Sequence, residues 1–170
     1  MRYLPLLALL LLAGCYAERQ QPISAVDHTG GVKPGGPIAV WAHPSDHWFD
    51  WSAIELAATA SERGLMRAGG ATGTRIDARD SARLPTTIAA AKAAGAWALL
   101  EVTVDWSPNR GERNDYPYAV PTSRFTLAGT LHEVATGRIA WSGQVSFVST
   151  DAIPGVTPHA ERLAGAAIAP

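Results

Sequence analysis

Four side chains that suit a divalent metal ion lie close together in the first third of the chain. They are His43, Asp46, His47 and Asp50, in an H-x₂-D-H-x₂-D pattern that follows an apolar run. Imidazole nitrogens and carboxylate oxygens are typical ligands of zinc and similar ions. The pattern predicts a site for a metal or another small ligand. Because Asp and Ser also favour helix starts, a purely structural role stays open.

A fifth candidate ligand, Asp105, lies near the end of an alternating apolar run. Ligands of open α/β sheets bind beyond the carboxyl ends of parallel strands, so Asp105 and the first cluster are expected at one rim of the sheet. The neighbouring Glu101 and Thr103 are expected to form a solvated strand face. His132 and His159 are expected at the surface.

A second candidate site is the long polar segment 107–121, which contains Arg110, Arg113, Tyr116 and Tyr118. Arginine and tyrosine are enriched at protein interfaces. Connections longer than about 12 residues in compact domains are commonly either functional or disordered. The segment therefore predicts a protein-binding loop, with a mobile loop that has no partner as the alternative.

The chain carries no catalytic signature. It contains no G-x-S-x-G nucleophile motif, and the glycine-rich segment 69–73 lacks the Lys-Ser/Thr pair of a phosphate-binding loop. A formal net charge of −1 gives no electrostatic basis for binding nucleic acid. We therefore expect neither an enzyme, nor a cofactor, nor a nucleic-acid partner.

The only cysteine, Cys15, follows Leu12, Ala13 and Gly14 at the end of a short apolar run. This arrangement resembles the lipobox of bacterial lipoproteins, where the cysteine is acylated and becomes the first residue of the mature protein. Residues 1–14 have the parts of a secretory signal, and their apolar run is shorter than the roughly 20 residues that span a bilayer. An ordinary signal peptide with a chance cysteine is the alternative.

The lipobox resemblance also predicts where the protein resides. Family members stay at the inner membrane mainly when Asp follows the cysteine, whereas Tyr16 follows here. The resemblance therefore implies a lipid anchor in the outer membrane, with the protein facing the periplasm. Residues 15–36 are rich in glycine and proline, and we expect them to form a lipidated, flexible tether averaging roughly 25 Å end to end.

Residues 37–170 are expected to form one globular domain, since apolar residues make up 47% of the chain and six are tryptophan. Strands are predicted at 38–42, 74–77, 97–106, 124–134 and 138–148, and helices at 52–66, 86–94 and 159–167. The second of these strands is the weakest, and Ser52 is expected to cap the first helix. Pro85 is expected to open the second helix and Gly95 to close it, and Thr157-Pro158 to cap the third. The β-α-β-α-β-β-β-α order predicts an α/β fold, with a mixed sheet of four to five strands in two or three layers. Two to three helices and a carboxyl-terminal antiparallel hairpin complete it.

Alternation along the strands predicts which side chains face the core. On 97–106 the inward set is Ala98, Leu100, Val102, Val104 and Trp106, and on 138–148 it is Ile139, Trp141, Val145 and Phe147. Within the first helix, the inward stripe is Ile54, Ala57, Ala58, Ser61 and Leu65. We expect Trp141 to be buried against the helices.

Several short motifs resemble a known group of proteins. They are AGAW at 94–97, EVATG at 133–137 before Trp141, and Asp105-Trp106 followed by a charged loop and 121–125. They look like small periplasmic lipoproteins with the fold of the TolB amino-terminal domain, the curli secretion lipoprotein and the penicillin-binding-protein activators. They also resemble a family of small lipoproteins known as a domain of unknown function. The resemblance covers residues 38–168, transfers no catalytic residue, and implies adaptor or assembly work with another envelope protein.

Overall fold

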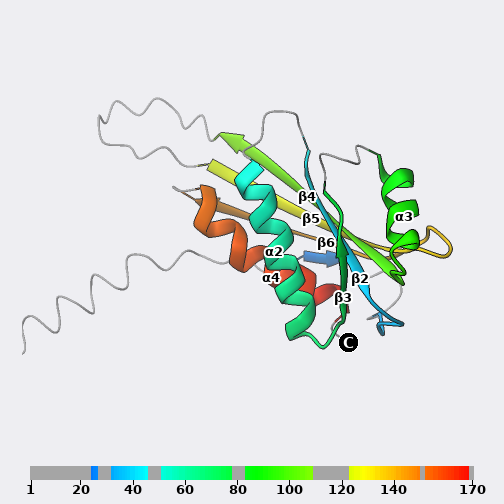
Figure 1. The fold of residues 1–170 in the computed structure, drawn as a ribbon. Helices are drawn as coiled ribbons and strands as arrows, with labels where there is room; N and C mark the ends of the chain where they lie inside the picture. Colours follow the sequence, from blue (N-terminus) through cyan, green and yellow to red (C-terminus); the bar gives the residue numbers. More distant parts are fainter. Residues whose placement is uncertain are drawn as a thin grey trace, which may run out of the picture.

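The fold is that of a computed structural model, which describes residues 24–26, 32–45, 51–77, 83–108, 123–149 and 152–168. Its elements are β1 (Ser24–Val26), β2 (Ile38–Pro44), α2 (Trp51–Arg67), β3 (Thr72–Arg75), α3 (Leu84–Ala93), β4 (Ala98–Pro108), β5 (Ser123–Glu133), β6 (Ile139–Ser149) and α4 (Ala152–Ile168). From β2 onward the order is the predicted β-α-β-α-β-β-β-α, and the α/β fold class is confirmed (Figure 1).

All six strands belong to one mixed sheet, in the order β1-β6-β5-β4-β2-β3. β2 runs parallel to both β3 and β4, whereas β4, β5, β6 and β1 pair antiparallel. The parallel part follows from the helices that connect its strands, and the antiparallel part from the β5–β6 hairpin. The sixth strand, β1, was not predicted, because its three residues lie within the expected tether and are too few to show alternation.

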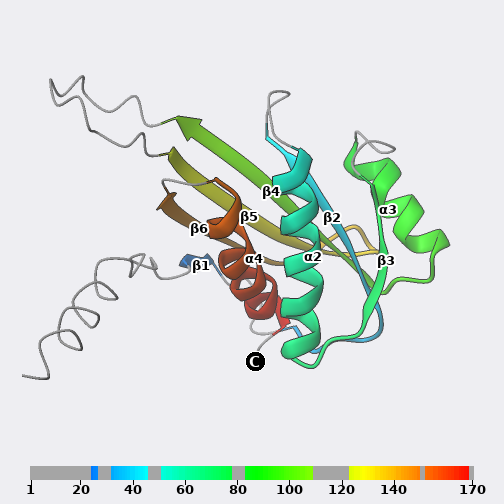
Figure 2. The same cartoon turned by 60° about the vertical axis from the view of Figure 1, so that its left-hand side comes forward.

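Two helices cover one face of the sheet, and a third covers part of the other. α2 and α4 lie side by side on the first face (Figures 1 and 2), where their apolar stripes meet the inward side chains of β2, β4, β5 and β6. α3 lies against the opposite face, in a smaller cluster with Ala39, Trp41, Leu99 and Val134. The domain therefore has three layers near α3 and two elsewhere.

Trp141 is the largest side chain beneath α4, and it is 2% exposed, which confirms the predicted burial. Its ring lies over two glycines that face each other across β5 and β6, Gly129 and Gly143. A Cβ on Gly143 would lie 2.6 Å from the indole ring, and one on Gly129 would lie 3.1 Å from it. The two glycines therefore make the space that the indole occupies.

A β-bulge near the hairpin changes the predicted inward face of β6. Leu131 pairs with Trp141, whereas the next residue, His132, pairs with Ile139, so Ala140 is the extra residue. Ala140 is buried and Ile139 is 50% exposed. The prediction that Ile139 shares the face of Trp141 is wrong, because the bulge interrupts the two-residue period.

The helix boundaries show where local sequence signals hold. The predicted inward stripe of α2 is buried throughout, but the helix begins at Trp51, so Ser52 lies in its first turn and is not the cap. Gly69 follows the end of α2 and Gly95 follows the end of α3, and both have positive φ. In each case the next residue donates its backbone N–H to a carbonyl oxygen in the last turn of the helix, which is a Schellman motif. The predicted closure at Gly95 is confirmed.

Two predicted elements have other limits in the structure, and one side chain predicted to face inward is exposed. β3 lies two residues earlier than predicted, pairing irregularly with β2 at the sheet edge. α4 begins about two turns before His159 and contains Pro158. The buried Val156 extends the apolar stripe of α4 through that proline. Trp106, predicted to face inward, is 41% exposed near the carboxyl end of β4.

Within the described ranges, the helices are too short or too polar for any of them to cross a bilayer.

Candidate functional site

Beyond α3, the sheet face opposite α2 and α4 carries polar side chains, and none of the described helices packs over it. Register sets these side chains in rows across β4 and β5: Glu101 faces Thr130, Thr103 faces Ala128, and Asp105 faces Thr126. The rows continue onto β6 through Ser142, Gln144 and Ser146. We call these residues, together with His43 and His132, the polar sheet face.

A carboxylate shared by two histidines lies at the centre of this face. The Nε2 atom of His43 lies 3.0 Å from Oε1 of Glu101, and Nε2 of His132 lies 2.9 Å from Oε2. The three residues come from β2, β4 and β5, so the parallel and antiparallel pairings of β4 both contribute. The side chains of Glu101 and His132 are only 18% and 5% exposed.

The histidines control the charge of Glu101. Burial alone would raise its pKa, but hydrogen bonds from His132 and His43, with their positive charge, outweigh burial and lower the pKa of Glu101 from 4.5 to about 2. Glu101 is therefore a carboxylate at any pH at which the protein is expected to work.

Both ring nitrogens of His43 have oxygen partners. Nδ1 lies 3.1 Å from the carbonyl oxygen of Pro44, while Nε2 lies 3.0 Å from the carboxylate of Glu101 and 3.3 Å from Oγ1 of Thr103. The ring also stacks on Trp41 with centroids 4.1 Å apart. The two histidines therefore hold the charged carboxylate of Glu101 in a fixed, half-buried position. Such an arrangement suits recognition of a partner or local structural order.

The structure brings two of the five predicted metal ligands to the same face. His43 and Asp105 lie on neighbouring strands, as expected for the rim, but His43 binds Glu101 and Asp105 accepts a 2.7 Å hydrogen bond from Ser45. Asp46, His47 and Asp50 lie outside the described residues. Among the residues that are described, no three ligand-type side chains are grouped so that they could hold a metal ion.

The sequence interpretation missed Glu101 and His132. Glu101 is half-buried and not solvated, His132 is 4% exposed, and His159 is fully buried against Phe147, with ring centroids 4.1 Å apart. The expectation that these histidines lie at the surface is therefore wrong. The long β4–β5 connection does not fix register, so the sequence carried no signal that His132 lies beside Glu101.

The remaining predicted site residues cannot be placed. Arg110, Arg113, Tyr116 and Tyr118, proposed as a binding loop, and Cys15, proposed as the lipidation site, lie outside the described residues. Their roles stay predictions.

No protein-family model matches the chain, and no curated protein matches it. Solved structures show what its fold is similar to. The PelC dodecamer from Paraburkholderia phytofirmans is 16% identical, with a TM-score of 0.62 over 88% of this chain and 99% of that chain. This likeness shows that the two chains share a fold.

Two further solved structures are similar at lower TM-scores. Lipoprotein GNA1162 from Neisseria meningitidis is 17% identical, over 72% of this chain and 90% of that one, with a TM-score of 0.45. The LpoB carboxyl-terminal domain from Salmonella enterica is 19% identical, over 69% and 86%, with a TM-score of 0.39. The statement of a shared fold rests on PelC, whose TM-score is above 0.5.

Proposed function

We propose that this chain is a lipid-anchored protein of the bacterial envelope whose α/β domain is a non-catalytic assembly module. The observation that carries the proposal is the fold shared with PelC along 99% of the PelC chain, together with the description of PelC as a dodecamer. The first expected partner is another copy of this chain, as in the PelC dodecamer. A second expected partner is another protein of the envelope.

The polar sheet face supports an interaction role. Hydroxyl and amide groups lie in adjacent rows on β5 and β6, and most are only partly buried. The buried His132 and the half-buried Glu101 fix the position of charge beneath that surface. A rigid sheet that presents hydrogen-bonding groups is a suitable platform for a protein partner.

The anchor belongs to the same proposal. Lipidation at Cys15 in the outer membrane would hold the domain at the periplasmic face, as the lipobox resemblance implies. Two or more acyl chains make such an anchor stable, because each buried methylene contributes about 0.8 kcal/mol.

The experiment is a mass measurement of the full chain extracted from its own membrane, followed by crosslinking in that membrane. We expect an assembly whose mass is a multiple of the mass of the processed, lipidated chain that begins at Cys15. Gln144→Arg adds a charge on the exposed part of the polar sheet face and should reduce the mass of the assembly. The control Thr86→Arg, at an exposed position of α3, should leave the mass of the assembly unchanged. A monomer that crosslinks to no protein would overturn the proposal.

A metal- or small-ligand-binding role for the rim around His43 and His47 is the alternative that the sequence predicts. His43 and Asp105 do share one face, but both ring nitrogens of His43 already have oxygen partners. Metal analysis of the purified chain tests the alternative. A bound divalent ion that disappears when both histidines are replaced would favour it over the assembly module.

A further inference from the structure

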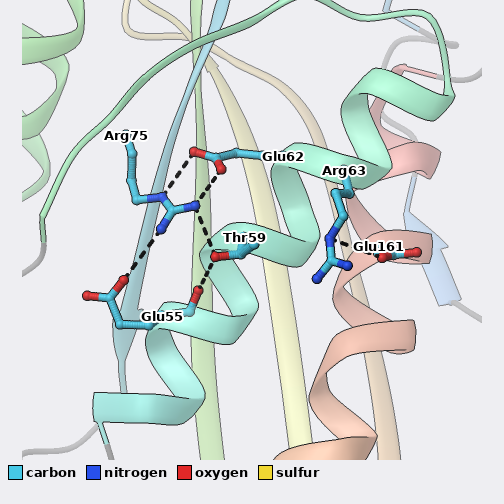
Figure 3. Close-up of polar contacts among 6 residues, drawn as sticks. All are labelled: Glu55, Thr59, Glu62, Arg63, Arg75 and Glu161. Atoms are coloured by element: carbon cyan, nitrogen blue, oxygen red, sulfur yellow. Dashed lines mark hydrogen bonds and ion pairs between the residues drawn. The ribbon is translucent and has the colours of Figure 1, made fainter.

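The two edges of the sheet differ in how they are protected against pairing with another chain. β3 forms one edge with only four residues, one of them Gly73, and its register with β2 is irregular. It ends in Arg75, whose guanidinium donates to Glu62 and Thr59 of α2 (Figure 3). Short length, an irregular register and a charged side chain all oppose the addition of a strand at an edge. The β3 edge is therefore protected.

The edge beyond β6 is covered over only part of its length. β1 pairs with β6 at residues 142–144, although β6 extends from Ile139 to Ser149. Before this stretch, the bulge at Ala140 interrupts the edge. Among the residues that the structure describes, no strand lies along the outer side of 145–149. Successive residues of an antiparallel strand direct their N–H and C=O groups alternately to the two sides, so at least two of these five residues direct theirs outward.

Segment 145–149 has none of the features that protect β3. Its sequence is Val-Ser-Phe-Val-Ser, without charge, proline or glycine, and its register with β5 is regular. Val145 and Phe147 are buried in the core, where Phe147 stacks on His159 of α4. On the opposite face, Val148 is 42% exposed. An uncharged edge that is held in place by the core is a suitable template for an added strand.

A second copy of the chain has the edge that matches this segment. Residues 145–149 of two copies can pair antiparallel about a two-fold axis, so that each edge supplies the hydrogen-bonding groups that the other lacks. Because the segment carries no charge, this symmetric contact places no like charges opposite each other. β1 occupies the position beside Gln144 in both copies, so the five open residues pair with Phe147 opposite its counterpart. Ser146 of one protomer then faces Val148 of its partner.

We infer that two copies of this chain pair through β6, with their sheets joined antiparallel along residues 145–149. The inference rests on the proposed assembly and deepens it, because it names the residues at the contact. Opposed residues of an antiparallel pair lie on the same face of a sheet, so the two polar sheet faces become one surface. An assembly built from such pairs contains an even number of chains.

Cysteines placed at the contact test the pairing. Ser146→Cys combined with Val148→Cys brings thiols of two copies opposite each other, with Cβ atoms about 5 Å apart. A short bis-maleimide reagent, added to the full chain in its own membrane, should link the chains as dimers. Ile139→Cys, an exposed position at the far end of the same strand, is the matched control. Its two copies would lie about 50 Å apart, so it should give only the background of the unsubstituted chain.

A charge at the edge should weaken the pairing without unfolding the domain. Val148→Lys places two ammonium groups near the two-fold axis and adds the kind of charge that opposes strand addition. In sedimentation of the full chain in detergent, we expect the dimer Kd to rise at least about tenfold. Val148→Thr keeps a β-branched, uncharged side chain and should change the Kd by less than about twofold. Circular dichroism of both variants checks that the fold is retained.

The outcomes distinguish this inference from the proposed function. Dimers linked at positions 146 and 148, with weaker association in Val148→Lys, support both. A wild-type assembly that persists in Val148→Lys and links no more than the Ile139→Cys control keeps the proposed function and overturns the pairing, as does an odd number of chains. A monomer that crosslinks to no protein overturns both. A monomer that loses another envelope protein in Val148→Lys assigns the edge to that protein and overturns pairing between copies.

Discussion

Among the carboxyl groups of the described residues, Glu101 has the pKa that its neighbours shift most. Its pKa is about 2 in the folded protein, whereas an ordinary glutamate has 4.5. A carboxyl group with a lowered folded pKa stabilises the protein above its unfolded pKa, and this contribution is lost as the pH falls through the folded value. The relevant range is therefore from about pH 4.5 down to about pH 2.

Replacing Glu101 by Gln should remove that contribution. At pH 7 we expect the free energy of unfolding to fall by at most about 3 kcal/mol, which is the cost of the pKa difference. Between pH 4.5 and 2, wild type and variant should converge, because the wild-type carboxylate becomes protonated. Denaturant titrations across this range measure both effects. Asp105→Asn, an exposed carboxylate on the same strand, is the control; a parallel loss in both variants would contradict the assignment to the histidine pair.

Trp141 and Ile139 provide a second comparison at this scale. Trp141→Ala should lower the free energy of unfolding by about 3–5 kcal/mol, since it empties the space above Gly129 and Gly143. Ile139→Ala should change it by less than about 0.5 kcal/mol, because half of that side chain is exposed. Chemical denaturation of both variants checks the pair, and equal losses would mean that the bulge at Ala140 is absent in solution.

The burial of single side chains was predictable where a strand or helix kept a regular spacing of apolar residues. The burial of Trp141 and of the α2 stripe followed from regular spacing of apolar residues. Ile139 was not predictable, since an extra residue in the strand leaves no mark on composition. Glu101 and His132 are neighbours only because of the β4–β5 register, and alternation fixes the face of a strand but not its register.

Among the elements, the contact between α2 and α4 depends on one glycine. A Cβ on Gly64 would lie 2.9 Å from Cα of Glu161 and still closer to its carbonyl oxygen. The backbone of α4 therefore packs directly against α2 at the position where Gly64 has no side chain. Glu161 also forms ion pairs with Arg63, at 3.5 Å (Figure 3), and with Arg67. Both ion pairs cross the same interface, so the helix spacing is set there.

Gly64→Ala and Gly165→Ala form a matched pair across this interface. In a helix, Gly to Ala alone stabilises by about 0.5–1 kcal/mol. Gly165→Ala should show this gain, because its Cβ would lie 3.6 Å from the nearest atom. Gly64→Ala should instead destabilise by about 1–3 kcal/mol, since overlap with Glu161 forces the helices apart. Thermal unfolding distinguishes them, and a gain at both positions would contradict the close approach.

Element types were easier to predict than element limits. Gly95 and Pro85 delimit α3 by known local chemistry, and both predictions hold. Pro158 looked like the start of the last helix, but apolar packing at Val156 outweighs the hydrogen bond that proline removes. β1 could not be found from sequence, because a three-residue strand is specified by its partner β6.

At the scale of the whole molecule, the proposed lipidation of Cys15 would decide where the domain resides. Cys15→Ser should move the protein from the membrane fraction to the soluble fraction, because no acyl chain can then be attached. Fractionation with labelled fatty acid measures the effect. The melting temperature of the domain should not change, and label recovered equally in both proteins would rule out lipidation at Cys15.

If Cys15 carries the proposed lipid anchor, the pairing of β1 with β6 limits how far the domain can stand from the membrane. Residues 16–23 alone connect Cys15 to Ser24, and fully extended they reach at most about 30 Å. With Cys15 in the bilayer, the β1 edge is therefore the membrane-proximal side. The β3 edge lies about 24 Å further across the sheet, given a strand spacing near 4.8 Å.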